Sequence, residues 1–197
     1  MAGVDVPFAC RCGKVQGTVH EVAPDRGNHL KCYCRDCQTA ANFLGYQDTL
    51  DEWGGTSIFQ TIPRFVEFEK GQQHLACLRL SPKGMLRWYA GCCNTPLFTM
   101  FDNPRFALAG MNMMVIAEED RAKFGPYVGR YSTKGARSAP EGFKDQGIPR
   151  AFALVFWRAV KAQLRGDDGT PFFDRNGQPV VSPRVLTLEE RRAARPD

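Results

Sequence analysis

The amino-acid sequence predicts a mostly β protein, with antiparallel sheets in its N-terminal part and a helix and hairpin extension at its C-terminal end. Short apolar segments alternate with turn residues as far as residue 108, which is typical of antiparallel strands. A longer segment with helical periodicity and an Asn-Gly pair follow later. We therefore expect a β domain at residues 1–120, with a loop, helix and hairpin extension at residues 121–197 packed on it.

The expected strands of the β domain begin with residues 14–19, where every second residue is apolar or glycine. Residues 28–32 form a second expected strand that leads into a cysteine-rich stretch, and residues 36–43 are expected to form a short helix after it. The remaining expected strands, separated by turns, are residues 57–62, 65–68, 74–80, 85–89, 97–101 and 105–108.

The extension has a different composition from the β domain. Residues 125–147 are rich in Gly, Ser, Lys and Pro, so we expect a long exposed loop. Pro149 then begins a predicted helix that runs to about residue 164 and ends at Gly166. The apolar face of this helix is expected to consist of Phe152, Val155, Phe156, Ala159, Val160 and Gln163.

Two local signals follow the predicted helix. Asn176-Gly177 lies between strand-like arms within residues 172–181, which is typical of a type I′ hairpin. Thr187 and Glu190 form a capping box that predicts a short helix. This last helix is basic, with Arg191, Arg192 and Arg195.

Composition restricts the function classes. The chain has 197 residues, of which 43% are apolar and 24% charged, as in an ordinary globular protein that folds without disulfides. The net charge of +5 is compatible with a small anionic ligand but too weak to indicate nucleic acid as a partner. No segment approaches the ~20 apolar residues of a membrane span, and the first residues lack the pattern of a signal peptide. We therefore expect a cytoplasmic protein that does not bind a membrane, and the sequence leaves its oligomeric state open.

Most of the eight cysteines are closely spaced. The closely spaced ones are Cys10, Cys12, Cys32, Cys34, Cys37, Cys92 and Cys93. In a chain without an export signal, such spacings suit metal chelation better than disulfide geometry. Thiolates are soft ligands, which zinc accepts at about 2.3 Å. The sequence therefore predicts two unlike zinc sites, one closed and structural and the other one ligand short.

The site that lacks a ligand is expected at Cys32, Cys34 and Cys37, because no fourth ligand stands clearly beside them. Three protein ligands leave one tetrahedral position open for water or substrate. Zinc held by three thiolates is a poor activator of water, but it can bind a thiol and keep it as thiolate. The alternative is an inert structural site, closed by His29 three residues upstream of Cys32.

Three ordered motifs within residues 7–115 carry a resemblance to a known family. They are Cys10-x-Cys12-Gly13-x-Val15-x-Gly17-x-Val19, Cys32-x-Cys34-x2-Cys37, and Tyr89-Ala90-Gly91-Cys92-Cys93-Asn94-Thr95-Pro96-Leu97. In order and separation they resemble the motifs of the glutathione-dependent formaldehyde-activating enzymes, a family shared with centromere protein V.

The resemblance implies an Mss4-like fold, in which antiparallel sheets surround cysteine zinc sites. It implies one structural zinc held by the first and third motifs and a second zinc, at the reaction site, held by the middle motif. Members of the family condense formaldehyde with glutathione and are classed as carbon–sulfur lyases. The implied function is thus a zinc-dependent lyase that acts on a small thiol such as glutathione, with the three cysteines of the middle motif as its catalytic residues.

The chain departs from the family pattern in two places. Ala90 stands where the third motif has its first cysteine, Cys93 stands at the second position, and Cys92 lies beside it. The structural site therefore either uses Cys92 as a displaced ligand or is incomplete. Tyr33 replaces a histidine that many relatives carry in the middle motif.

A different class of function also fits these residues: a non-catalytic, zinc-stabilised module that binds protein or nucleic acid, with which the basic tail is compatible. A fourth ligand that closes the middle site favours the module, whereas a pocket over an open position favours the enzyme. An enzyme that takes glutathione needs basic partners for two carboxylates. By residue type alone the candidates are Arg35, Arg64 and Arg87.

Overall fold

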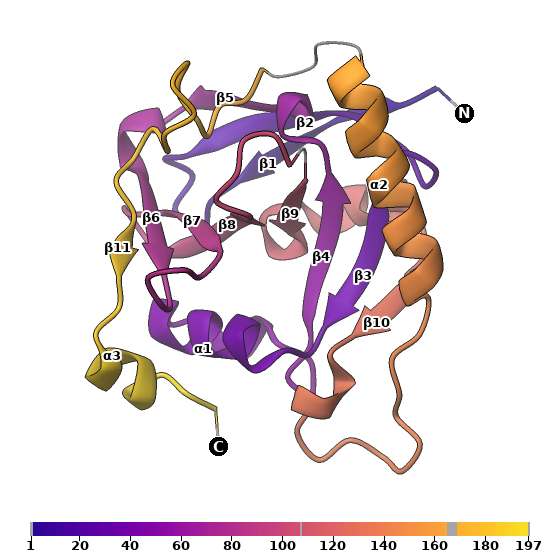
Figure 1. Cartoon of the computed structure of the whole chain (residues 1–197), viewed down its shortest axis with the longest axis vertical. Coiled ribbons are helices and arrows are strands. Elements are labelled where there is room, and N and C mark those ends of the chain that lie inside the picture. Colours follow the sequence, from indigo (N-terminus) through magenta and orange to yellow (C-terminus); the bar gives the residue numbers. More distant parts are fainter. Residues whose placement is uncertain (1, 107, 165–168, 197) are drawn as a thin grey trace.

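The computed structural model describes residues 2–106, 108–164 and 169–196, and its strands form two sheets (Figure 1). The small sheet has the order β1-β2-β5, from strands Val4–Ala9, Gln16–Val22 and Val66–Lys70. The large sheet has the order β10-β3-β4-β9-β8-β7-β6-β11. Its strands in chain order are β3 Asn28–Cys32, β4 Thr56–Thr61, β6 Leu75–Arg79, β7 Leu86–Ala90, β8 Thr95–Met100, β9 Ala109–Asn112, β10 Gly129–Tyr131 and β11 Arg184–Val185.

The predicted mostly β architecture is confirmed, and most neighbouring strands pair in antiparallel fashion. The two exceptions are the outermost strands of the large sheet. β10 pairs with β3 in parallel, and β11 pairs with β6 in parallel. Both come from the region after residue 120, so this region extends the large sheet at its two edges.

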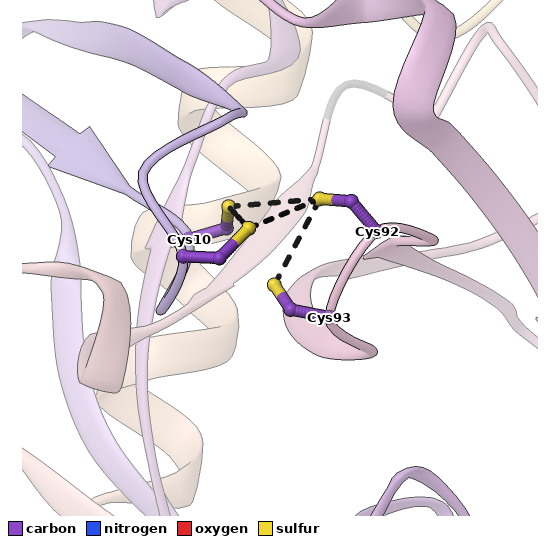
Figure 2. A group of neighbouring side chains, drawn as sticks. Cys10, Cys92 and Cys93 are labelled. Atoms are coloured by element: carbon purple, nitrogen blue, oxygen red, sulfur yellow. Dashed lines mark hydrogen bonds between the residues drawn. The ribbon is translucent and has the colours of Figure 1, made fainter.

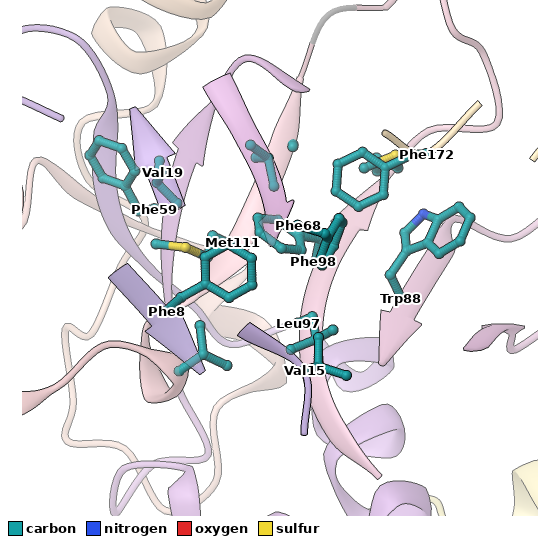
Figure 3. Close-up of a cluster of buried hydrophobic side chains, with 14 of the residues drawn as sticks. Phe8, Val15, Val19, Phe59, Phe68, Trp88, Leu97, Phe98, Met111 and Phe172 are labelled. Atoms are coloured by element: carbon teal, nitrogen blue, oxygen red, sulfur yellow. The ribbon is translucent and has the colours of Figure 1, made fainter. Parts of the chain in front are cut away.

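An aromatic cluster joins the two sheets (Figure 3). Phe8 and Phe68 of the small sheet lie edge to face, with ring centroids 5.5 Å apart, and Phe98 of the large sheet lies 5.6 Å from Phe8. Phe172, from the segment after the long helix, is fully buried 5.2 Å from Phe98. Aromatic pairs in such geometry stabilise a core beyond the area that they bury.

The small sheet packs closely because of the alternation seen in the sequence. Val15, Gly17 and Val19 are buried, whereas the residues between them are at least partly exposed. A Cβ atom at Gly17 would lie 2.0 Å from the backbone oxygen of Glu67, so only glycine lets β2 approach β5 at this point.

Three α-helices accompany the sheets in the described part of the chain: α1 (Arg35–Leu44), α2 (Ile148–Leu164) and α3 (Leu188–Ala193). All three lie where the sequence predicts a helix, and α3 begins with the expected capping box of Thr187 and Glu190. Figure 1 shows α2 alongside β3 and β10, and α1 at the other end of β3. The short 3-10 helices are Gln47–Thr49, Pro63–Phe65, Gln72–His74, Met113–Val115, Glu118–Phe124 and Thr133–Gly135.

Two predictions for the extended segments are wrong, and one strand is not predicted. Residues 105–108 form no strand where they are described, because the chain turns there and β9 begins only at Ala109. Residues 125–147 are not simply a loop, since β10 lies within them. The sequence does not predict β1, although Val6 and Phe8 alternate with more exposed neighbours.

The expected hairpin within residues 172–181 is present as an antiparallel bridge between Phe173 and Pro179, but its turn is not of type I′. Gly177 has φ of 75°, but Asn176 does not have the positive φ that a type I′ turn requires. Instead the Asp174 carboxylate accepts hydrogen bonds from the backbone N–H groups of Asn176 and Gln178, at 2.8 and 2.9 Å. The side chain of Asp174 therefore fixes a different turn, with only the glycine in the left-handed region.

The predicted apolar face of α2 is confirmed only in part. Val155 is buried, but Phe156 is 64% exposed and does not belong to the packed face. The side chains of Phe152, Ala159 and Gln163, and Gly166 as the predicted helix end, lie outside the described residues. No helix in the described ranges has both the length and the apolar character needed to cross a membrane.

Candidate metal centres

The structure gathers seven of the eight cysteines into two clusters. The four-cysteine cluster consists of Cys10, Cys12, Cys92 and Cys93. The three-cysteine cluster consists of Cys32, Cys34 and Cys37. Within each cluster the sulfur atoms all lie within 4.8 Å of one another, and every cysteine is a free thiol. Four sulfurs at about 2.3 Å from a tetrahedral zinc lie about 3.8 Å apart, so both clusters have the spacing of a metal site.

In the four-cysteine cluster, Cys92 is central (Figure 2). Its sulfur lies 4.0 Å from that of Cys10, 3.4 Å from that of Cys12 and 3.9 Å from that of Cys93. Cys92 therefore lies where a displaced ligand would lie, and the cluster brings together four sulfurs that could hold a metal ion. Ala90, at the place of the expected cysteine, is fully buried at the end of β7 and offers no ligand.

Two tight turns bring these four thiols together. In the turn between β1 and β2, Gly13 has φ of 74° and its N–H donates to the Cys10 oxygen at 2.9 Å. In the turn between β7 and β8, Asn94 has φ of 57°, a conformation that asparagine tolerates better than most residues. Because both turns belong to hairpins, the sheets themselves fix the positions of the thiols.

The buried side chains around Cys93 support the four-cysteine cluster. Thr95 Oγ1 lies 3.0 Å from Cys93 Sγ and 2.7 Å from the Tyr46 hydroxyl, and it accepts a hydrogen bond from the backbone N–H of Arg11 at 3.0 Å. Tyr46 also donates to the Cys93 carbonyl oxygen at 2.9 Å. Burial opposes ionisation of Cys93, but hydrogen bonds from Thr95 and from backbone N–H groups lower its pKa to about 6. Burial and the neighbouring thiols raise the pKa of Cys92 to about 12. Within this cluster Cys93 therefore ionises at a lower pH than Cys92.

The three-cysteine cluster lies at the junction of β3 and α1. Cys32 ends β3, Cys34 caps the N-terminus of α1, and Cys37 lies in its first turn. The backbone N–H of Cys37 donates to Cys34 Sγ at 3.3 Å, and the sulfurs of Cys37 and Cys32 are 3.8 Å apart. A strand end followed directly by a helix thus places all three sulfurs on one side of the backbone.

Arg87 of β7 reaches this cluster from the large sheet. Its Nη1 atom donates to Cys37 Sγ at 4.0 Å. Hydrogen bonds from the thiols of Cys32 and Cys34, with the charge of Arg87 added, hold the pKa of Cys37 well below its ordinary value. Hydrogen bonds with the other two thiols and burial raise the pKa of Cys32. Cys37 is therefore the sulfur of the cluster that ionises most readily.

His29 does not close the three-cysteine cluster, so that alternative is wrong. Its Nδ1 lies 2.8 Å from the Gly125 oxygen and its Nε2 lies 3.1 Å from Ser57 Oγ. Residues three apart on a strand point to opposite faces, which separates His29 from Cys32. No histidine, aspartate or glutamate among the described residues joins the cluster.

A small pocket lies beside Cys37, between α1 and one face of the large sheet, with a cavity volume of about 40 Å³ and an opening to solvent. The residues that define its shape include Cys37, Ala41, Leu44, Ile58, Arg87 and Thr99. Arg87 is buried, at 7% exposure, and it makes no ion pair with a carboxylate of the described residues. Arg35 and Arg64, the other arginines considered for glutathione, do not line this pocket.

The remaining cysteine and the methionines have no role in these centres. Cys77 is buried in β6, 2% exposed, as a small apolar residue. Met111 and Met113 are buried in the core that joins the two sheets. The spacing of the cysteines in the sequence identifies all seven cluster residues, whereas Arg87 is marked by residue type only.

The fold and the clusters define a β protein with two sites that could hold a metal ion. The chain belongs to DUF6151, described as a family of unknown function, which matches residues 1–182. No curated protein matches the sequence. A structural-genomics protein from Rhodobacter sphaeroides matches with a TM-score of 0.44 and 15% identity, covering 61% of this chain and 96% of that one. This likeness is too distant to carry an argument about function.

Proposed function

We propose that the protein is a zinc-dependent, carbon–sulfur lyase-like enzyme that acts on a small thiol. In this proposal the three-cysteine cluster is the reaction centre and the four-cysteine cluster is structural. The observation that carries it is the pocket beside Cys37, at the cluster that has three sulfurs and no further ligand among the described residues. The motif resemblance to the formaldehyde-activating enzymes supports the choice of zinc and of reaction class, and a cytoplasmic location belongs to the same proposal.

The residues of the three-cysteine cluster fit zinc. Their sulfurs are soft donors within 4.8 Å of one another, the range expected around one tetrahedral ion. A zinc ion held by Cys32, Cys34 and Cys37 would bind a guest thiol and keep it as thiolate at neutral pH. Arg87 adds a positive charge next to Cys37 and so limits the repulsion between the thiolates.

The pocket walls determine what a guest thiol meets. Ala40, Ala41 and Leu44 of α1 form an apolar wall that keeps most water away from the sulfur. In the reaction, the guest's thiolate sulfur forms a bond to the carbonyl carbon of a small aldehyde, and the π electrons of the carbonyl move to its oxygen. The oxygen takes a proton from water, which balances the proton that the thiol released. No atom is oxidised or reduced by an outside reagent.

The proposal is tested by metal analysis of the unmodified protein beside Cys34→Ser, with Cys77→Ala as a control that removes a thiol outside both clusters. We expect two zinc ions in the unmodified protein and in the control, and one in Cys34→Ser with an unchanged circular dichroism spectrum. Serine is a good N-cap residue, so the variant removes the ligand and preserves the start of α1. Unchanged zinc in Cys34→Ser would show that the cluster is not a metal site.

Titration with a thiol separates the enzyme from a binding module. An enzyme of this kind gives a calorimetric binding signal with a millimolar small thiol, and Cys34→Ser loses that signal. Two bound zinc ions without any heat of thiol binding would instead favour a non-catalytic module. The basic tail gives the module limited support, because Arg191 already pairs with Asp36 at 3.4 Å.

A further inference from the structure

The pocket beside Cys37 contains the guanidinium of Arg87, whose hydrogen-bond donors the protein only partly uses. Arg87 is 7% exposed, and its guanidinium donates to a single sulfur atom at 4.0 Å. A guanidinium has five N–H donors in a planar fork, so one sulfur leaves most of them unused. The unused donors of this guanidinium can therefore bind an anion that enters the pocket.

The rest of the pocket wall is apolar or neutral. Besides Cys37, its polar groups are the hydroxyls of three threonines, the amide of Asn112 and the indole N–H of Trp88; the threonines are Thr49, Thr56 and Thr99. The hydroxyl of Thr56, which is 8% exposed, has no hydrogen-bond partner among the described residues. No aspartate or glutamate of the described residues lines the pocket, so an ammonium group inside it would find no carboxylate.

We propose that this pocket selects a small thiol that carries one carboxylate and no ammonium group, and that Arg87 binds the carboxylate. That the guest carries a thiol rests on the function proposed above. That it carries a carboxylate is inferred from Arg87 and the other residues that line the pocket. Arginine and carboxylate pair through two parallel hydrogen bonds, which fixes the direction of the guest as well as its charge. Glutathione, with two carboxylates and an ammonium group, matches this wall poorly.

The test compares two thiols of similar size and opposite charge, 3-mercaptopropionate and cysteamine. Their binding is measured by calorimetry on protein whose metal content has been determined. We expect 3-mercaptopropionate to bind at least about tenfold more tightly than cysteamine, because a charged hydrogen bond contributes that much or more. Arg87→Met removes the preference, whereas Arg35→Met, which changes an exposed arginine beside the cluster, retains it. Equal affinities of the two thiols for the unmodified protein would overturn the proposal.

Propionate, which lacks the thiol, separates this inference from the proposed function. If propionate binds as tightly as 3-mercaptopropionate and Arg87→Met abolishes both, the anion site stands and the thiol function fails. If both thiols and glutathione bind equally well and only through the three-cysteine cluster, the function stands and the selection by Arg87 fails.

A second variant covers the case in which Arg87→Met does not fold. Ala41→Leu adds a larger side chain to the α1 wall of the pocket without changing any charge or metal ligand. We expect it to weaken binding of 3-mercaptopropionate at least about tenfold, since overpacking a tight site costs more than about 1 kcal/mol. The metal content stays the same in this variant. Unchanged binding in a folded Ala41→Leu protein would mean that the guest lies elsewhere and would overturn the proposal.

Discussion

The four-cysteine and three-cysteine clusters use the same ligand type, yet they occupy opposite situations in the fold. The four-cysteine cluster contains thiols from two hairpin turns, one from each sheet, so a metal ion held there would link the small sheet to the large one. The three-cysteine cluster joins one strand to the helix that follows it, and those elements are already adjacent in sequence. Loss of the first cluster therefore separates distant parts of the chain, whereas loss of the second changes a local junction.

The surroundings of the two clusters differ as well. Thr95 and Tyr46 supply neutral hydrogen bonds to the four-cysteine cluster, and its fourth sulfur completes the set. The three-cysteine cluster has instead a cation, Arg87, and a pocket. A complete ligand set with a neutral frame is typical of a structural metal, and an incomplete set beside a charged pocket is typical of a reactive one.

The largest expected effect is on stability, and it compares one ligand from each cluster. Cys10→Ser removes a buried ligand that helps to join the two sheets, so we expect a loss of about 3 kcal/mol and a fall of about 10 °C in the unfolding midpoint. Cys34→Ser should lose about 1 kcal/mol or less, because serine preserves the helix cap. Thermal unfolding followed by circular dichroism measures both. Equal losses of stability in the two variants would contradict the proposal that only the four-cysteine cluster is structural.

Metal removal should also distinguish the clusters. A chelator is expected to take one metal ion at least about tenfold faster than the other, because a site with three protein ligands offers it a free coordination position. The fast ion should be the one that Cys34→Ser lacks, so this variant should show only the slow phase. Stopped-flow absorption of a coloured zinc chelator records the two phases. A single phase for both ions in the unmodified protein would count against an open site.

A smaller effect is expected from the frame of the four-cysteine cluster. Thr95→Val removes the hydroxyl that contacts Cys93, Tyr46 and the Arg11 backbone, at a cost of about 2 kcal/mol and about tenfold in metal affinity at this cluster. Tyr46→Phe serves as the matched control, since it preserves the contact between Thr95 and Cys93. Competition with a chelator gives the affinities. If Thr95→Val weakened metal binding at the three-cysteine cluster, the proposed role of Thr95 would be wrong.

The smallest effect concerns the sheet that carries Cys10 and depends on pH. His20 on β2 lies 2.9 Å from Glu67 on β5 and 3.1 Å from Asp5 on β1. Hydrogen bonds to Glu67 and then Asp5 raise its pKa, so the folded state favours the protonated ring. This contribution is complete below the unfolded pKa of about 6.5 and is lost as the pH rises through the folded pKa.

We therefore expect His20→Gln to lower the free energy of unfolding at about pH 5.5 and to leave it nearly unchanged at about pH 9. The difference should stay under about 1 kcal/mol, because the three groups are partly exposed. Urea unfolding at the two pH values measures it. A variant that is equally destabilised at both would show that packing of the ring, rather than its charge, stabilises the small sheet.

Several local signals in the sequence are confirmed, whereas pairing between distant segments is not predicted. The strand at Asn28–Cys32, the helix that follows it and the capping box at Thr187 depend on neighbouring residues, and the sequence predicts all three. It does not predict β10, because this strand has only three residues and its partner β3 lies about a hundred residues upstream. Pairing over that separation leaves no local pattern in a segment rich in glycine and lysine.

In the candidate site, too, residues close in sequence are predicted and contacts between distant residues are not. Cysteine spacing is a local feature, so the order of residues along the chain is enough to identify both clusters. Arg87 lies fifty positions from Cys37 and meets it only through the order of strands in the large sheet. His29 is a candidate ligand by its nearness in sequence, yet the alternation of β3 turns it away.

The two parallel strands from the C-terminal region have a consequence for self-association. β10 covers the free edge of β3 and β11 covers that of β6, so the outermost strands of the large sheet have only three and two residues. Long, bare strand edges recruit strands from other molecules, and short outer strands are a common protection against it. A chain cut at residue 120 would uncover both inner edges at once, so such a fragment should form insoluble β-rich aggregates even with all seven cysteines of the two clusters present.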